Sequence, residues 1–129
     1  MKIIGIDHLV LTVRNITKTC AFYSRVLGMR DIEFAGGRKA LLFGRQKINL
    51  HEVGKEFKPH AQIPLPGTAD ICFIAGDDIN DVVEHIKSCG VAIEEGPVNR
   101  DGATGTMQSI YIRDPDGNLV EVSTYRDKR

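Results

Sequence analysis

The feature of this sequence that most restricts its fold is an order of elements that occurs twice. In each half the side-chain pattern predicts a strand, a helix closed by glycine, and three further strands. His8 and Gly28 are 20 positions apart in the first half, and Asp70 and Gly90 are also 20 positions apart in the second. Because one such unit cannot cover the inner face of its own sheet, the two copies are expected to pair, within a chain or between chains. A ligand site is then expected on the concave sheet face.

The first βαβββ unit is predicted over residues 3–53. Apolar alternation predicts a strand over residues 3–13, and helical spacing predicts a helix over residues 16–27. Asn15 or Thr17 is the expected N-cap of that helix. Three short strands follow, near residues 29–34, 38–43 and 46–53.

The second unit is predicted over residues 69–125, after a linker at residues 54–68 that has three prolines and no regular period. It begins with a strand over residues 69–75, and Asp78 is the expected cap of its helix. Further strands are predicted near residues 92–95, 107–113 and 118–124, with a glycine-containing loop over residues 99–106. The whole chain, residues 1–129, is thus expected to be one α+β domain built from two modules.

Composition excludes several classes of function. Lys plus Arg equals Asp plus Glu at 17 each and there is no Trp, so nothing favours a nucleic-acid partner. The three cysteines have no CxxC spacing and are typical of a reducing compartment. Apolar runs are too short for a signal peptide or a membrane span. We expect a cytoplasmic protein that binds neither membrane nor nucleic acid.

The residue types of Asp-Pro-Asp-Gly at residues 114–117 strongly favour a turn. The strand predicted after this turn contains the carboxylate of Glu121. Alternation puts Glu121 on the same strand face as Leu119. Glutamate is almost never fully buried unless it is paired or bound to a cation. From this stretch alone, Glu121 is either such a group or a solvated side chain on an edge strand.

Equivalent positions of the two units carry potential metal ligands. His8 and Asp70 lie on the first strand of their units, and Glu121 lies on the last strand of the second unit. The counterpart of Glu121 in the first unit is Asn49, with His51 on the same strand face. Such oxygen and nitrogen donors suit Mn²⁺, Fe²⁺, Co²⁺, Ni²⁺ or Zn²⁺, with positions left for substrate.

Three segments, at residues 6–13, 22–29 and 113–122, occur in the order found in the vicinal oxygen chelate superfamily. The chain resembles this superfamily, which contains glyoxalase I, fosfomycin-modifying enzymes, extradiol dioxygenases and bleomycin-binding proteins. Residues 46–57 are most similar to its small glyoxalase-domain-containing branch. The resemblance implies two βαβββ modules that form a cupped mixed sheet around a divalent metal ion, in a homodimer.

Carried over residue by residue, the resemblance implies that His8, Asp70 and Glu121 are the metal ligands. Asp70 stands where many members have His, and Asn49 stands where glyoxalase I-like members have Glu or Gln. The implied activity is that of a metal-dependent lyase or isomerase, which chelates two adjacent oxygens of a small oxygenated metabolite or its thiol adduct. Glu121 is expected to be a ligand or a base, and His51 a base or an alternative ligand.

Two other functions stay open: a ligand-sequestering protein of the bleomycin-resistance type, and a thiol transferase acting on an epoxide such as fosfomycin. Asn49, Arg100 and Tyr111 are the candidate substrate-binding residues, with Arg100 as a bidentate fork for a carboxylate. Each candidate has a structural alternative. His8 could be a hydrogen-bonded core histidine, Asp70 a cap at the end of the linker, and Arg100 a solvated loop residue.

Overall fold

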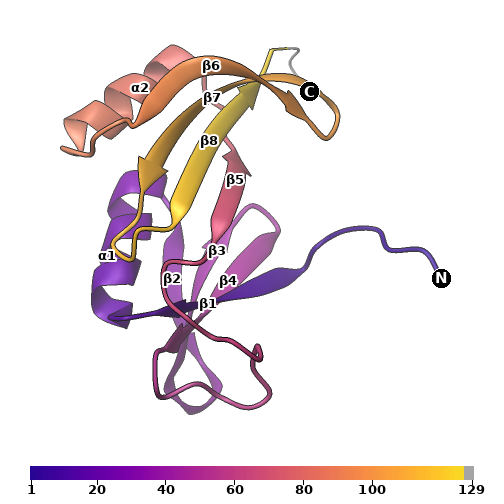
Figure 1. Cartoon of the computed structure of the whole chain (residues 1–129), viewed down its shortest axis with the longest axis vertical. Coiled ribbons are helices and arrows are strands. Elements are labelled where there is room, and N and C mark those ends of the chain that lie inside the picture. The colour runs from indigo at the N-terminus through magenta and orange to yellow at the C-terminus, as the bar shows by residue number, and fades with distance from the viewer. Residues whose placement is uncertain (127–129) are drawn as a thin grey trace. The chain divides into compact units, whose positions relative to one another are not determined.

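The computed structural model describes residues 1–126 and divides the chain into two compact units. Unit 1 comprises residues 1–67, and unit 2 begins at Thr68. The boundary falls at the end of the predicted linker. Both units contain one helix and one four-stranded mixed sheet in the order βαβββ (Figure 1). The predicted α+β fold of two βαβββ modules is therefore confirmed.

Unit 1 is a sheet with the strand order β1-β4-β3-β2. Strand β1 is parallel to β4, and the other two pairings are antiparallel. A short 3₁₀ turn, Ala35–Gly37, separates the second strand from the third. The elements are β1 (His8–Val13), α1 (Ile16–Leu27), β2 (Arg30–Phe34), β3 (Arg38–Phe43) and β4 (Gln46–Glu52).

Helix α1 has the predicted bounds because its ends carry the right capping residues. The Asn15 side chain accepts a hydrogen bond from the backbone N–H of Lys18 at 2.9 Å. Gly28 ends the helix with φ of 67°, a left-handed conformation that glycine adopts without a steric penalty. The buried side of the helix packs on the sheet through Thr19, Cys20, Tyr23 and Val26.

Unit 2 repeats this topology with the strand order β5-β8-β7-β6, again with the first strand parallel to the last. Its elements are β5 (Asp70–Ile74), α2 (Ile79–Ser88), β6 (Glu95–Gly102), β7 (Gly105–Arg113) and β8 (Leu119–Tyr125). Asp78 caps α2, as predicted, and accepts a hydrogen bond from the backbone N–H of Asn80. No helix within residues 1–126 is long and apolar enough to cross a membrane.

The predictions for β6 are wrong in two respects. The strand begins at Glu95 rather than near residue 92, and the predicted loop at residues 99–106 is a hairpin in which Gly102 pairs with Gly105. Position 102 is closely packed, since an added Cβ would lie 2.7 Å from both Met107 Sδ and the Tyr125 hydroxyl oxygen and would displace these side chains. These glycines therefore belong to paired strands, although glycine clusters usually indicate loops.

The Asp-Pro-Asp-Gly turn holds the starts of β5 and β8 together. The buried Asp114 carboxylate accepts hydrogen bonds from the backbone N–H of Asp116 at 2.9 Å and from Asn118 Nδ2 at 2.7 Å. Asn118 Oδ1 in turn accepts a hydrogen bond from the backbone N–H of Ala69 at 2.9 Å. The turn therefore fixes the register of the two strands that carry Asp70 and Glu121.

Each sheet has one face that packs on the helix of its own unit and one that we call the open face. The helix-covered face of unit 1 contains the buried residues Leu11, Val13, Leu41, Ile48 and Leu50. That of unit 2 contains Ile110, Ile112, Val120 and Val122. Because side chains alternate along a strand, the candidate ligands lie on the two open faces.

Candidate functional site

Asp70 and Glu121 lie on adjacent strands of the open face of unit 2. Asp70 is paired with Leu119, and Cys72 is paired with Glu121, so Glu121 is displaced from Asp70 by one strand and two residues. Asp70 is exposed, and Glu121 is half-buried. Two carboxylates can therefore share one side of this sheet.

Unit 1 has the same arrangement with different side chains. His8 is paired with Lys47, and Val10 is paired with Asn49, so Asn49 is displaced from His8 as Glu121 is from Asp70. His8 is exposed, and its Nδ1 lies 2.8 Å from the Asp7 carboxylate. Within unit 1, His8 is therefore a surface residue with a carboxylate partner.

A chain of hydroxyl and thiol groups reaches the Glu121 carboxylate through Ser123. Ser123 Oγ donates a hydrogen bond to Glu121 Oε2 at 3.2 Å, and the same Oγ lies 2.6 Å from Ser109 Oγ and 3.2 Å from Cys72 Sγ. These contacts fix one carboxylate oxygen of Glu121. The sequence analysis did not single out Ser123 or Cys72, although strand alternation already placed Ser123 on the face of Glu121.

Tyr111 lies opposite Glu121 in the β7–β8 pairing and is held by Arg100. Arg100 Nε donates a hydrogen bond to the Tyr111 hydroxyl oxygen at 2.8 Å, and Arg100 Nη2 donates to Glu95 Oε2 at 2.9 Å. Burial raises the pKa of the Tyr111 phenol; the charge of Glu121 raises it further and Arg100 opposes the change. Arg100 therefore lies in strand β6 rather than in the predicted loop, with its guanidinium directed at Tyr111.

A cavity of about 390 Å³ lies beside these groups within unit 2. It is lined by Cys72, Ile74, Arg100, Asp101, Gly102, Ala103, Met107, Glu121 and Tyr125. Carboxylate, guanidinium and thiol groups thus border one space that also has an apolar side. Such a space suits a small ligand with polar and apolar parts.

His51 and Asn49 form the inner part of the open face of unit 1. His51 is only 8% exposed, and its ring lies edge-on to Phe57 with 5.7 Å between the ring centroids. Within residues 1–126, neither His51 Nδ1 nor Asn49 Oδ1 has a hydrogen-bond partner. Burial lowers the pKa of His51, with smaller effects from Arg38 and His60 in the same direction, while Glu56 opposes them. The imidazole is therefore held toward its neutral form.

Two of the three predicted metal ligands, Asp70 and Glu121, lie on one sheet face, and the third, His8, does not. Among residues 1–126, no three His, Cys, Asp or Glu side chains converge into a ready metal-binding group. Asp70 and Glu121 do share one face of one sheet, and carboxylate oxygens are suitable ligands for divalent ions. His8 lies in the other unit, so a site made from all three side chains remains a proposal.

Two βαβββ units of identical topology define the class of fold to which this chain belongs. Residues 5–122 match the model of the Glyoxalase/Bleomycin resistance protein/Dioxygenase superfamily. The chain belongs to this superfamily.

Similar proteins come from bacteria and a fungus. Virulence protein STM3117 from Salmonella typhimurium is 58% identical over 97% of this chain and 87% of that protein. Its crystal structure has a TM-score of 0.96, with 97% of this chain and 99% of that chain covered. Glyoxalase domain-containing protein RDO1 from Mycosarcoma maydis is 50% identical over 100% of this chain and 73% of that protein. Metallothiol transferase FosB from Staphylococcus epidermidis is 32% identical over 93% of this chain and 83% of that protein.

Proposed function

We propose that this protein is a glyoxalase-like, metal-dependent lyase or isomerase that acts on a small oxygenated metabolite or its thiol adduct. The observation that supports this best is the position of Glu121, a half-buried carboxylate on an open sheet face that it shares with Asp70. Two carboxylates on one face supply oxygen ligands of the kind that divalent ions prefer. Membership of the superfamily supports the same conclusion.

His8, Asp70 and Glu121 would hold the ion, whose identity among Zn²⁺, Ni²⁺, Mn²⁺, Co²⁺ and Fe²⁺ is open. A divalent ion in this place would supply Lewis-acid polarisation of two adjacent substrate oxygens. The hydrogen bond from Ser123 orients one oxygen of Glu121, which leaves its other oxygen for the ion or for a proton.

Tyr111 would donate a hydrogen bond to the substrate, and His51 would accept a proton from it. The Tyr111 phenol is protonated at neutral pH, as its ordinary pKa of 10.0 already requires, and would donate a hydrogen bond to a substrate oxygen. The lowered pKa of His51 favours the neutral imidazole, which can accept a proton. Asn49 and Arg100 would orient the substrate, Asn49 through its unpartnered amide oxygen.

A second candidate function is thiol transfer to an epoxide such as fosfomycin. The similarity to a metallothiol transferase at 32% identity over most of both chains favours it specifically. The same ligands would serve both reactions. Incubating the metal-loaded protein with a thiol and an epoxide, and measuring thiol consumption, separates this reaction from conversion of a methylglyoxal–thiol adduct.

The deciding experiment is elemental analysis of the purified protein. We expect about one divalent ion per chain, followed by turnover in a screen of methylglyoxal adducts, epoxides and catechols. No bound ion, even after incubation with Mn²⁺, Ni²⁺ or Zn²⁺, would instead favour the ligand-sequestering function. Light scattering tests the proposed homodimer, and a monomeric mass would contradict it.

A further inference from the structure

On the open face of unit 1 the four strands carry cations and no acidic side chain, while Asp7 and Glu56 of the flanking segments lie near His8 and His51. Alternation and strand register place three residues from each of the four strands on this face. They are His8, Val10 and Thr12 on β1, Lys47, Asn49 and His51 on β4, Arg38, Ala40 and Leu42 on β3, and Arg30, Ile32 and Phe34 on β2. The acidic residues Asp31, Glu33 and Glu52 of the same strands alternate onto the opposite face. The acidic residues of the strands therefore lie on the helix-covered face, together with Lys39, whose Nζ lies 3.8 Å from the Asp31 carboxylate.

The cations of this face are positioned without being neutralised. The Arg38 guanidinium lies 4.2 Å from the centroid of the Phe57 ring, and Lys47 Nζ lies 4.4 Å from that of Phe34. Among residues 1–126, neither of these cations nor Arg30 forms an ion pair with a carboxylate. Aromatic faces hold a cation in place while leaving its charge available.

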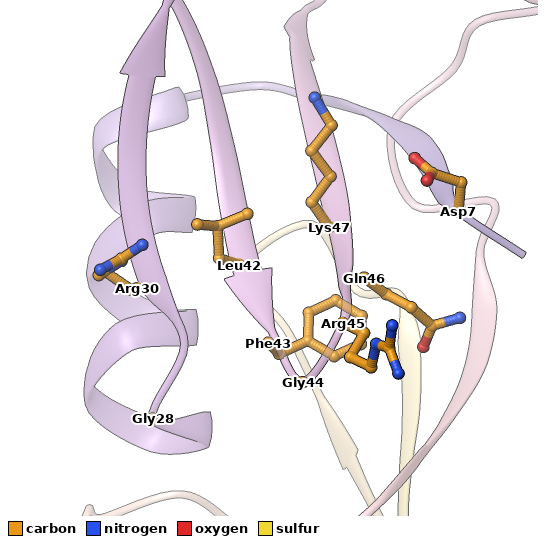
Figure 2. A pocket seen from close by; sticks show the side chains of 9 residues that line it. All are labelled: Asp7, Gly28, Arg30, Leu42, Phe43, Gly44, Arg45, Gln46 and Lys47. Atoms are coloured by element: carbon orange, nitrogen blue, oxygen red, sulfur yellow. The ribbon is translucent and has the colours of Figure 1, made fainter.

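A pocket of about 480 Å³ lies at one end of this face, beside the turn between β3 and β4 (Figure 2). Arg30, Leu42 and Lys47 form one row across three strands, because Arg30 is paired with Leu42 and Leu42 with Lys47. Arg45 adds a third cation from the turn. The one acidic residue among the described residues that line the pocket is Asp7, whose carboxylate lies 2.8 Å from His8 Nδ1.

Two buried polar atoms of the same face also lack partners. His51 Nδ1 and Asn49 Oδ1 have no hydrogen-bond partner within residues 1–126, and His51 is more than nine-tenths buried. Buried polar atoms are nearly always hydrogen-bonded, so a ligand that reaches them is expected to offer polar groups. Both residues are on β4, two and four positions beyond Lys47.

We propose that the open face of unit 1 binds the oxyanion of a small hydroxylated metabolite. Arg30 and Lys47 would contact the phosphoryl, phosphonyl or carboxylate oxygens, and Asn49 would accept a hydrogen bond from a hydroxyl group. Val10, Ile32 and Leu42 offer apolar contact to the carbon skeleton. Identifying this anion as part of the substrate rests on the proposed function, whereas anion binding itself is testable without metal or turnover.

The test is an NMR titration of the metal-free, full-length protein with inorganic phosphate and, separately, with acetate at constant ionic strength. We expect saturable shifts of the Arg30, Leu42 and Lys47 amide signals. Saturation by phosphate alone assigns a phosphoryl or phosphonyl group, and saturation by acetate assigns a carboxylate. The double variant R30Q/K47Q should weaken binding by about tenfold or more, because two charge-assisted contacts are removed.

K18Q is the matched control, because it removes an exposed cation from helix α1 of the same unit. It should keep the wild-type affinity, and K47R should restore most of the affinity that K47Q loses. Linear, unsaturated shifts with both anions, or equal losses in K18Q and R30Q/K47Q, would overturn the proposal. E121Q tests the metal site independently: it should lose metal and still bind the anion that saturates the wild-type protein, so a failure of one proposal leaves the other intact.

Discussion

Glu121 lies two residues beyond the strand partner of Asp70, on the adjacent parallel strand and on the same open face. Asn49 has the same relationship to His8 in unit 1. The internal repeat thus presents the same pair of positions twice, with two carboxylates in one unit and an imidazole and an amide in the other. This difference assigns the negative charge of the proposed site to unit 2.

Replacing Glu121 with Gln should abolish metal retention while changing the free energy of unfolding by less than about 1 kcal/mol, since the side chain is half-buried and nearly isosteric with glutamine. Elemental analysis and urea denaturation measure the two effects. Glu84→Gln, on the exposed side of α2, is the control and should keep the metal. A large loss of stability with unchanged metal content would show that Glu121 has a structural role.

Replacing Asn118 with Ala should destabilise the protein by about 3 kcal/mol. The change removes the hydrogen bonds to the Asp114 carboxylate and to the backbone N–H of Ala69, and leaves a buried carboxylate with one donor fewer. Chemical denaturation measures the loss. Asn99→Ala, at an exposed position of β6, is the control; equal losses in the two variants would contradict the importance of this turn.

Replacing Gly96 with Ala should cost at least about 2 kcal/mol through overpacking and backbone strain. The added Cβ would lie 2.3 Å from the backbone oxygen of Ser109, and φ at this position is +107°. Gly76→Ala is the matched control, because nothing lies within 4 Å of its Cβ position. Thermal unfolding measures the midpoints of both variants. Similar midpoints would show that Gly96 does not approach the Ser109 backbone this closely.

The stability of the protein should fall as the pH is lowered through and below the ordinary histidine pKa of 6.5, in part because of His51. Burial lowers the pKa of His51 in the folded state, so the unfolded chain binds its proton more readily at pH values between the two pKa values. The contribution of the neutral imidazole is therefore complete above pH 6.5 and is lost as the pH falls through the folded pKa.

His51→Gln should consequently reduce the difference in unfolding free energy between pH 7.5 and pH 5, measured by urea denaturation at both values. His85→Gln changes an exposed histidine on helix α2 of unit 2 and should keep the wild-type difference. If the two variants behave alike, the burial of His51 is not responsible for the acid-induced loss.

Local sequence signals were sufficient for most elements. Helix α1 has the predicted bounds because Asn15 and Gly28 supply a cap at each end, and α2 begins after Asp78 for the same reason. The region around β6 was mispredicted, because Gly102 and Gly105 resemble loop residues until their partners across the hairpin are known. Signals that depend on one residue and its chain neighbours were reliable, whereas signals that depend on cross-strand packing were not.

The sequence by itself determined the two βαβββ units and the equivalence of His8 with Asp70, because capping, alternation and spacing are local properties of the chain. The superfamily was indicated by the resemblance of three segments, at residues 6–13, 22–29 and 113–122. Only the tertiary structure decided which charges share a face. Arg30, Leu42 and Lys47 come from three strands, and their common row depends on the register of β2, β3 and β4. Register is set by the hydrogen bonds between neighbouring strands and by the turns that join them, so the alternation within each strand alone could not reveal the cationic face.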